Sequence, residues 1–220
     1  MGSDDHDERA AYWDRVADDK SFTHELDLRR FAAEVPRDAR ICDVGCGYGR
    51  TLATLAGRGY RELLGFDASA AMIRRGLRER PELDLRHLAS DRIPLADASQ
   101  DAALLLAVLT CVPGDEEQRA LVAELVRVLR PGGTLWVTDV WIQTDERHVA
   151  RYGGARPHGA PRGVFRHEEG VVFRHHDRRW IEELFGGSGT VDVEDVRFRT
   201  MNGNGVEAFR LLLRRDGHRG

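Results

Sequence analysis

Three closely spaced glycines are the first residues whose spacing could bind a ligand. Gly45, Gly47 and Gly49 follow Arg40–Val44, a short and mostly apolar run that we expect to be a buried strand. Glycine lets the backbone turn tightly and approach a ligand with no Cβ in the way. The dinucleotide-binding fingerprint needs glycines at positions one, three and six, and a phosphate-binding loop ends in Gly-Lys-Ser or Gly-Lys-Thr. The sixth position here is Arg50 and no lysine follows the loop, so the spacing fits neither of these loops.

Acidic residues near the ends of predicted strands are the second group of candidates. Asp43 lies within the first predicted strand, Asp67 follows a strand at 63–66, and Asp91 follows one at 83–88. Ligands of open parallel sheets bind beyond the carboxyl ends of the strands. A carboxylate placed there can attract a cationic group or accept hydrogen bonds from a ligand. The alternative role for an aspartate after a strand is to cap the next helix.

The elements that must hold these residues alternate along the chain. We expect strands at 40–44, 63–66, 83–88, 101–108, 134–141, 191–200 and 207–214, and helices at 8–19, 24–35, 50–58, 70–78, 115–129 and 177–185. Ser69 can cap one helix, and Asp115 with Gln118 forms a capping box for another. The turn Asn202–Gly205 joins the last two strands. Alternating strands and helices predict an α/β fold with a doubly wound, mostly parallel seven-stranded sheet and a C-terminal antiparallel hairpin.

Four segments resemble the motifs of the S-adenosylmethionine-dependent methyltransferases of the Rossmann-like class. They are Ile41–Arg50, Gly65–Ser69, Asp91–Ala102 and Arg127–Gly133, in register between about 38 and 141. The resemblance implies a methyltransferase domain over 38–220, preceded by an N-terminal helical cover over 1–37. Residues 143–170 are polar, rich in arginine and punctuated by glycine, so we expect them to form an insertion or lid.

The resemblance also implies S-adenosyl-L-methionine as the cofactor and places its parts along the motifs. The glycine loop is expected to pack on the methionine part, where Asp43 favours the cationic groups. Asp67 would accept hydrogen bonds from the ribose hydroxyls, and Asp91 or Ser90 would meet the adenine. The expected cofactor-binding residues are Asp43, Gly45, Cys46, Gly47, Gly49, Arg50, Asp67, Ala68, Met72, Ser90, Asp91, Arg92, Ala107, Thr110, Tyr12 and Trp13.

Methyl transfer is a direct displacement, so a base is needed only if the acceptor must lose a proton. The first candidates are His175 and His176, beside Asp177, which could orient an imidazole; the alternative is a solvated strand end. His24 and Tyr152 are further candidates. We expect no metal site: Asp139 supplies one carboxylate near the sheet, and one ligand cannot make an oxygen-rich site.

The net charge and the cysteine content restrict the classes of partner that the protein can have. The 220 residues carry a formal net charge of -4, so the chain is not globally attracted to nucleic acid. Three cysteines without CxxC spacing indicate reduced thiols and a cytoplasmic protein, and neither a secretory signal nor a run long enough to span a membrane is present. We therefore expect methylation of a small-molecule acceptor at O, N, S or C by a monomer or homodimer. The alternatives are an RNA or nucleoside methyltransferase and a cofactor-binding protein without methyl transfer.

Overall fold

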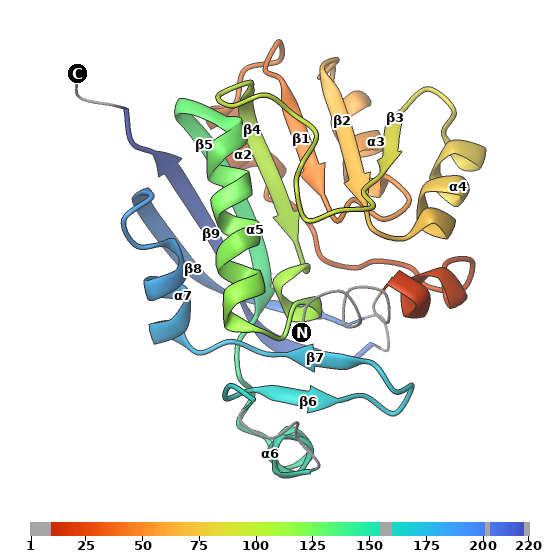
Figure 1. Cartoon of the computed structure of the whole chain (residues 1–220), viewed down its shortest axis with the longest axis vertical. Coiled ribbons are helices and arrows are strands. Elements are labelled where there is room, and N and C mark those ends of the chain that lie inside the picture. The colour runs from red at the N-terminus through yellow and green to blue at the C-terminus, as the bar shows by residue number, and fades with distance from the viewer. Residues whose placement is uncertain (1–9, 155–159, 201–202, 218–220) are drawn as a thin grey trace.

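Seven strands form one sheet through the molecule. They are β1 (Ile41–Val44), β2 (Leu63–Asp67), β3 (Asp84–His87), β4 (Gln100–Leu106), β5 (Leu129–Val140), β8 (Gly189–Arg199) and β9 (Gly205–Arg215). The computed structural model describes residues 10–154, 160–200 and 203–217. The strand order is β3-β2-β1-β4-β5-β9-β8 (Figure 1). Pairing from β3 to β5 is parallel, whereas β9 is antiparallel to both β5 and β8. The predicted sheet and its C-terminal hairpin are confirmed.

Helices cover both faces of this sheet. They are α2 (Leu28–Glu34), α3 (Arg50–Ala56), α4 (Ala70–Glu79), α5 (Asp115–Val128), α6 (Glu146–Gly153) and α7 (Arg178–Phe185), with a 3₁₀ turn η1 (Leu109–Cys111). In Figure 1, α5 and α7 lie in front of the sheet, and α2 and α3 lie behind it. None of the helices in the described ranges has the length and apolar character needed to cross a membrane.

The N-terminal segment is less helical than its sequence pattern indicates. The helix expected over 24–35 begins only at Leu28, because Asp27 Oδ1 accepts the backbone N–H of Arg29 at 3.1 Å and of Arg30 at 3.0 Å. Residues 20–27 contain no helix. Of the helix expected over 8–19, residues 10–15 are helical, and residues 8 and 9 lie outside the described residues.

The capping box expected at the start of α5 is wrong. The N-cap residue is Gly114, and Asp115 is already the first residue of the helix. Gln118 is fully buried and its side-chain amide donates to the carbonyl oxygens of Leu109 and Val112, at 3.0 and 2.6 Å. The Gln118 side chain therefore fastens η1 to α5 instead of turning back to cap its own helix.

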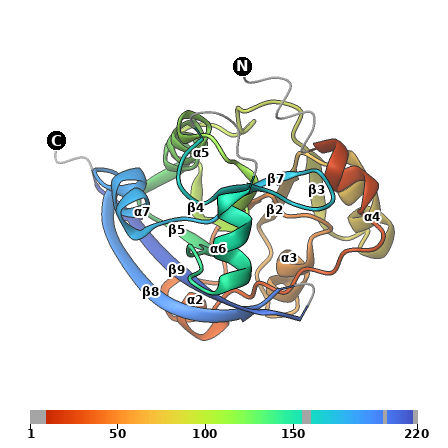
Figure 2. The same cartoon turned by 90° about the horizontal axis from the view of Figure 1, so that it is seen from below.

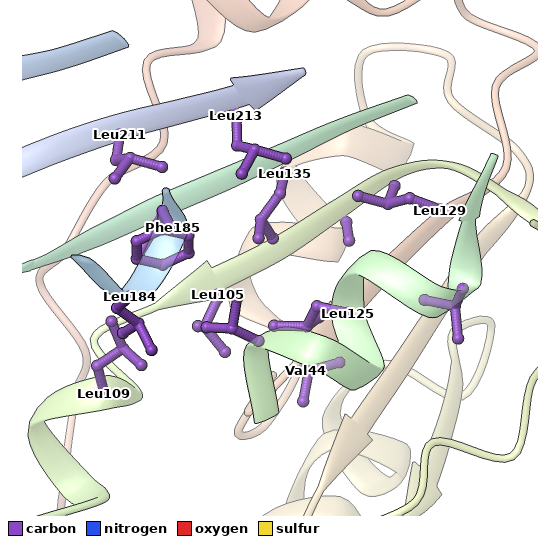
Figure 3. Close-up of a cluster of buried hydrophobic side chains, with 14 of the residues drawn as sticks. Val44, Leu105, Leu109, Leu125, Leu129, Leu135, Leu184, Phe185, Leu211 and Leu213 are labelled. Atoms are coloured by element: carbon purple, nitrogen blue, oxygen red, sulfur yellow. The ribbon is translucent and has the colours of Figure 1, made fainter. Parts of the chain in front are cut away.

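The largest core cluster lies between the sheet and the helices α5 and α7. Leu105 and Leu135 from the central strands meet Leu125 of α5 and Phe185 of α7 (Figure 3). All four side chains are fully buried. A second cluster on the other face of the sheet packs Phe31 of α2 against neighbouring strands. The sheet is therefore held rigidly from both sides, with its carboxyl edge left for a site.

The segment predicted to be an insertion lies below that edge. It contains α6 and a two-stranded antiparallel sheet of β6 (Val164–Arg166) and β7 (Val172–Arg174). Its residues 155–159 lie outside the described residues. Figure 2, seen from below, shows α6 in front of the sheet's carboxyl edge, with β7 crossing beside it. The insertion extends past the expected end at residue 170, and a bridge between Trp141 and His176 joins its two ends.

Packing around α5 predicts a large loss of stability when its core leucine is shortened. We expect Leu125→Ala to lower the free energy of unfolding by about 2–5 kcal/mol, because the rigid cluster cannot close the cavity left behind. Leu77→Ala is the matched control, since Leu77 is a helical leucine that is 40% exposed. Urea denaturation measures both variants, and equal midpoints would contradict this account of the core.

Candidate functional site

A cavity of about 610 Å³ opens at the carboxyl ends of the parallel strands. Its sheet-side wall includes Asp43 and Val44 at the end of β1, Asp67 of β2, Leu106 of β4 and Val140 of β5. Residues of the N-terminal segment and of the insertion line the opposite side: Ala10, Trp13, Phe22, Thr23, His24, Arg147, His148, Arg151, Phe165, His167, Phe173 and His175. The site is therefore a chamber between the sheet and two covering segments.

The glycine loop needs glycine at two positions for steric reasons. Gly45 and Gly47 have φ angles of +75° and +57°, which side chains rarely adopt. A Cβ on Gly45 would lie 2.3 Å from Val108, and one on Gly47 would lie 2.3 Å from the ring of Phe22. Cys46 is buried between them, and burial raises the pKa of its thiol well above the usual range. Its role is to fill space.

Asp67 ties the glycine loop to the start of α4. Its Oδ2 accepts the backbone N–H of Gly47 at 2.7 Å, and its Oδ1 accepts that of Ser69 at 2.8 Å. Ser69 in turn caps α4 by accepting the N–H of Met72 at 3.1 Å. Burial raises the pKa of Asp67 above its usual range. The carboxylate lines the cavity, and each oxygen keeps a further lone pair for a ligand hydroxyl.

Asp43 is a buried carboxyl with no hydrogen-bond partner among the residues described. It is 3% exposed and lines the cavity. Burial, and then the nearby Asp67, raise the pKa of Asp43 to about 8. A cationic ligand placed beside it would favour the ionised carboxylate and lower this pKa. The site is therefore electrostatically prepared for a positive group.

Three buried polar atoms beside the glycine loop also lack partners within the described residues. They are Thr23 Oγ1, His24 Nδ1 and Arg50 Nε, and all three residues line the cavity. The guanidinium of Arg50 donates to the backbone oxygen of His24, which brings the residues together. Buried donors and acceptors are normally satisfied. A ligand with a carboxylate and an amino group beside a cationic centre, as in S-adenosylmethionine, supplies partners for these atoms and for Asp43. The residues fit this cofactor.

The region expected to hold the adenine is more open. Met72 is buried and Ser90 and Asp91 are exposed, and all three line the cavity, as does Ala68. Arg92 is exposed and lies outside the lining, contrary to expectation. Tyr12 also lies outside it, because its hydroxyl donates to Glu169 Oε2 at 2.5 Å. Gly49 contributes its backbone turn rather than a cavity surface.

Glu169 connects the two covering segments. It lies in the turn between β6 and β7 and is approached by Lys20 Nζ at 3.3 Å as well as by Tyr12. The hydrogen bond from Tyr12 and the cation of Lys20 hold the pKa of Glu169 below its usual range. One carboxylate thus joins the N-terminal segment to the insertion, beside Trp13, which lines the cavity.

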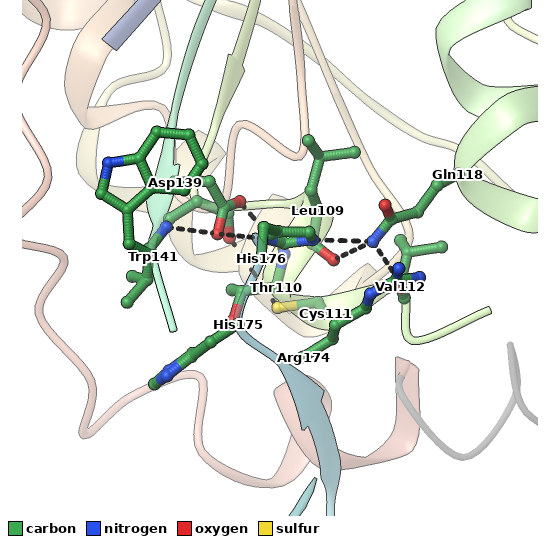
Figure 4. A network of polar contacts seen from close by, with 12 residues as sticks. Leu109, Thr110, Cys111, Val112, Gln118, Asp139, Trp141, Arg174, His175 and His176 are labelled. Carbon is green, nitrogen blue, oxygen red and sulfur yellow. Dashed lines mark hydrogen bonds and ion pairs between the residues drawn. The ribbon is translucent and has the colours of Figure 1, made fainter. Parts of the chain in front are cut away.

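A buried polar network supports the cavity wall after β4. Ala107 and Thr110 line the cavity, and the N–H of Thr110 donates to Asp139 Oδ2 at 3.0 Å. Asp139 is fully buried, which raises its pKa to about 7. Its Oδ1 lies 3.6 Å from His176 Nδ1, and His176 Nε2 lies 2.9 Å from the Gln118 amide nitrogen (Figure 4). The network holds η1 from the strand side and from α5.

His176 is therefore placed differently from expectation. It is 1% exposed and does not line the cavity, so it is neither a base in contact with an acceptor nor part of a solvated strand end. Burial lowers the pKa of His176 well below its usual value. Asp177 does not orient an imidazole, because it caps α7 by accepting the N–H of Trp180 at 2.9 Å. Over the described ranges, no cluster of three His, Cys, Asp or Glu residues has metal-binding geometry.

His175 points away from this network in Figure 4 and lines the cavity. Its Nδ1 is 2.6 Å from the hydroxyl oxygen of Tyr152, which accepts the backbone N–H of Gln143 at 3.0 Å. Burial lowers the pKa of His175 to about 3. Tyr152 itself lies outside the lining and positions the imidazole. His175 is consequently a neutral hydrogen-bonding group at neutral pH.

His148 and Asp145 are not among the site residues expected from the sequence. His148 is 3% exposed and lines the cavity, and its Nδ1 lies 2.5 Å from Asp145 Oδ2. Asp145 also caps α6, since its Oδ1 accepts the backbone N–H of His148 at 3.2 Å. The available signal was the spacing Asp-x-x-His at the start of a helix, which puts the two side chains on one face.

Comparisons with known proteins agree with the fold and with the sequence motifs. Residues 42–137 match the family described as methyltransferase domain. A demethylmenaquinone methyltransferase of Renibacterium salmoninarum is 29% identical over 222 residues, covering 94% of this chain and 92% of the relative. An O-methyltransferase of Pyrenophora dematioidea is 30% identical over 141 residues, covering 59% and 51%. The crystal structure of a SAM-dependent methyltransferase from Methanosarcina mazei shares the fold, with a TM-score of 0.80, 23% identity, and coverage of 87% of this chain and 99% of that one.

The chain contains a methyltransferase domain over residues 42–137 and has the fold of the class I S-adenosylmethionine-dependent methyltransferases. It is an enzyme that transfers a methyl group, and S-adenosylmethionine is its cofactor. When bound, the cofactor supplies a methyl group already activated by its sulfonium. The chain's residues must bind that cofactor, align an acceptor with it and exclude water.

The unpartnered Asp43 predicts a pH-dependent affinity for the cofactor. Because its pKa is about 8 in the free protein and lower beside a cation, binding at neutral pH must release a proton. The affinity for S-adenosylmethionine should therefore rise with pH, by at most about tenfold per unit, and level off above about pH 8. Calorimetry in buffers of different ionisation enthalpy counts the proton. Asp43→Asn should lose the proton release, and an unchanged release would contradict this assignment.

The position of Asp67 predicts weaker cofactor binding when its carboxylate is removed. Asp67→Ala should lower the binding free energy by about 1.5–3 kcal/mol, the scale for hydrogen bonds to a charged group. Asp84→Ala is the control, because Asp84 lies on the neighbouring β3, is exposed and pairs only with Arg86 among the residues described. Equal affinities of the two variants for S-adenosylhomocysteine would reject a role for Asp67 in binding.

Proposed function

We propose that this enzyme methylates a small-molecule acceptor held between the glycine loop and the insertion. The observation that carries the proposal is the covered cavity of about 610 Å³. Pockets for a single drug-sized ligand have volumes of about 300–1,000 Å³, and this one must accept both the cofactor and the acceptor. A folded RNA would need an open approach, and its phosphates would meet Glu116 and Glu117 on the wall. Both points favour a small acceptor.

The site geometry supports a set of proposed cofactor-binding roles. The methionine part would meet the unpartnered atoms of Thr23, His24 and Arg50, with Asp43 beside its cationic groups. The ribose hydroxyls would donate hydrogen bonds to the remaining lone pairs of the Asp67 carboxylate. Adenine would lie between Met72 and the wall near Ser90 and Asp91. By their names, one relative is a demethylmenaquinone methyltransferase and another is an O-methyltransferase. Both names are compatible with a planar acceptor that lies against Phe165 and Phe173.

Labelled methyl transfer tests the proposal. The full-length protein is incubated with methyl-labelled S-adenosylmethionine and either a small-metabolite extract or total RNA, and labelled products are found by mass spectrometry. We expect label in a small molecule, and no label without enzyme or with Asp67→Ala at cofactor concentrations below its dissociation constant. Label confined to RNA would favour the alternative acceptor, and binding without any transfer would overturn the proposal.

The pairing of His175 with Tyr152 predicts a positioning role. His175→Ala should raise the KM for the acceptor about tenfold, the scale of one neutral hydrogen bond, while cofactor affinity and kcat change little. Tyr152→Phe should change the KM in the same direction by less, because the imidazole stays but loses its partner. Kinetics on the identified acceptor measure both parameters. A large loss of kcat at constant KM would instead assign His175 a proton-transfer role.

A further inference from the structure

The insertion brings a second histidine to the acceptor side of the cavity, and its surroundings differ from those of His175. The ring of His148 lies 5.8 Å from that of His175 and 6.3 Å from that of Tyr152, centroid to centroid. Both histidines line the cavity. Only His148 has a carboxylate partner, because His175 is held by the neutral hydroxyl of Tyr152.

The hydrogen bonds of His148 fix which nitrogen carries its proton. The Asp145 carboxylate lies 2.5 Å from Nδ1 and can only accept, so Nδ1 must be the donor. This hydrogen bond holds the pKa of Asp145 below its usual range, which keeps the carboxylate ionised. Nε2 is then the nitrogen that carries the lone pair, and among the described residues it accepts a long hydrogen bond from the Arg147 guanidinium at 3.4 Å, which an acceptor's hydroxyl or N–H must displace.

The charges around this pair come from two elements. At the N-terminus of α6 and along it they are Asp145, Arg147 and Arg151, and directly after β7 the facing group is His175, whose Nδ1 contacts the hydroxyl of Tyr152 on α6. Arg151 lies over the ring of Phe165, 5.2 Å from its centroid. Asp145 is therefore the anion able to stabilise a positive charge that forms on His148.

We propose that His148, oriented by Asp145, accepts the proton of a hydroxyl or N–H acceptor during methyl transfer. This inference rests on the function proposed above and names the acceptor class: one whose nucleophilic atom carries a proton. Methyl transfer from a sulfonium to a thioether or a tertiary amine needs no base, because the accepting atom carries no proton. A buried imidazole that is hydrogen-bonded to an exposed carboxylate and lines the cavity suits an acceptor whose proton must leave.

The reaction balances with these groups alone. A lone pair on the acceptor oxygen or nitrogen forms the new bond to the methyl carbon while the carbon–sulfur bond breaks and its electron pair returns to sulfur. The acceptor proton passes to His148 Nε2, and the imidazolium is stabilised by Asp145. His175 donates or accepts a hydrogen bond without changing charge. The proton leaves His148 for solvent when the products depart.

Removal of each partner tests the inference on the full-length protein. Labelled transfer to the small-metabolite extract is measured between about pH 5.5 and 9 for the wild type, His148→Gln and Asp145→Asn. His148→Gln should lose roughly 100-fold or more in rate, the usual scale for a general base. Asp145→Asn should also lower the rate, because the imidazolium that forms on His148 then lacks its neighbouring anion.

Asp177→Asn is the matched control for the carboxylate. Asp177 caps α7 as Asp145 caps α6, by accepting a backbone N–H three residues ahead, but has no imidazole partner. Asparagine caps helices about as well as aspartate, so both variants should fold. Asp177→Asn should keep the wild-type rate, and a loss of rate equal to that of Asp145→Asn would reduce the Asp145 carboxylate to a structural role.

A spectroscopic readout separates this inference from the function it rests on. In the complex with S-adenosylhomocysteine, the Nδ1–H signal missing from His148→Gln reports the hydrogen bond to Asp145 by NMR. Its chemical shift should change in Asp145→Asn and stay unchanged in Asp177→Asn. Transfer at the wild-type rate by His148→Gln overturns the inference alone. Absence of transfer by the wild type, to any small molecule, overturns the proposed function and the inference with it.

Discussion

Parallel pairing of β1, β4 and β5 is the constraint on which the site depends. Parallel strands end at the same edge of a sheet, so the carboxyl ends of three neighbouring strands open into one cavity. The glycine loop, the η1 turn and the insertion all leave from this edge. Core packing on both faces of the sheet keeps the edge rigid. Loops of quite different sequence can therefore act on one ligand.

Desolvation by burial shifts the pKa values of titratable groups in both the cofactor half and the acceptor half of the site. Burial raises the pKa of Asp43 and Asp139 and lowers that of His24 and His175, so each group is pushed toward its neutral form. The ionisation of such a group responds strongly to a ligand of opposite charge, because that charge offsets the cost of burial. The exposed Asp145 is the exception, and it remains an anion beside a buried imidazole.

The cofactor half could be predicted from the sequence because its signals are local. Gly45, Gly47 and Asp67 follow strands at fixed spacing, and neighbouring strands bring them together without further information. The acceptor half could not be predicted in this way. Whether His176 is buried depends on Gln118 of α5, which is 58 residues away, and the pattern at Gln118 instead favoured a helix cap. His148 was missed because its partner looked like an ordinary N-cap residue.

Glu169 has a consequence for the order of events in a catalytic cycle. Tyr12 and Lys20 reach this one carboxylate from the N-terminal segment, while its backbone belongs to the insertion. The two segments also meet through an apolar cluster in which Tyr12 and Val16 pack against Val171 and Phe173. Opening of one cover must therefore break contacts with the other, and entry of the acceptor and exchange of spent cofactor would pass through the same open state. Such a chamber would load and empty as a unit.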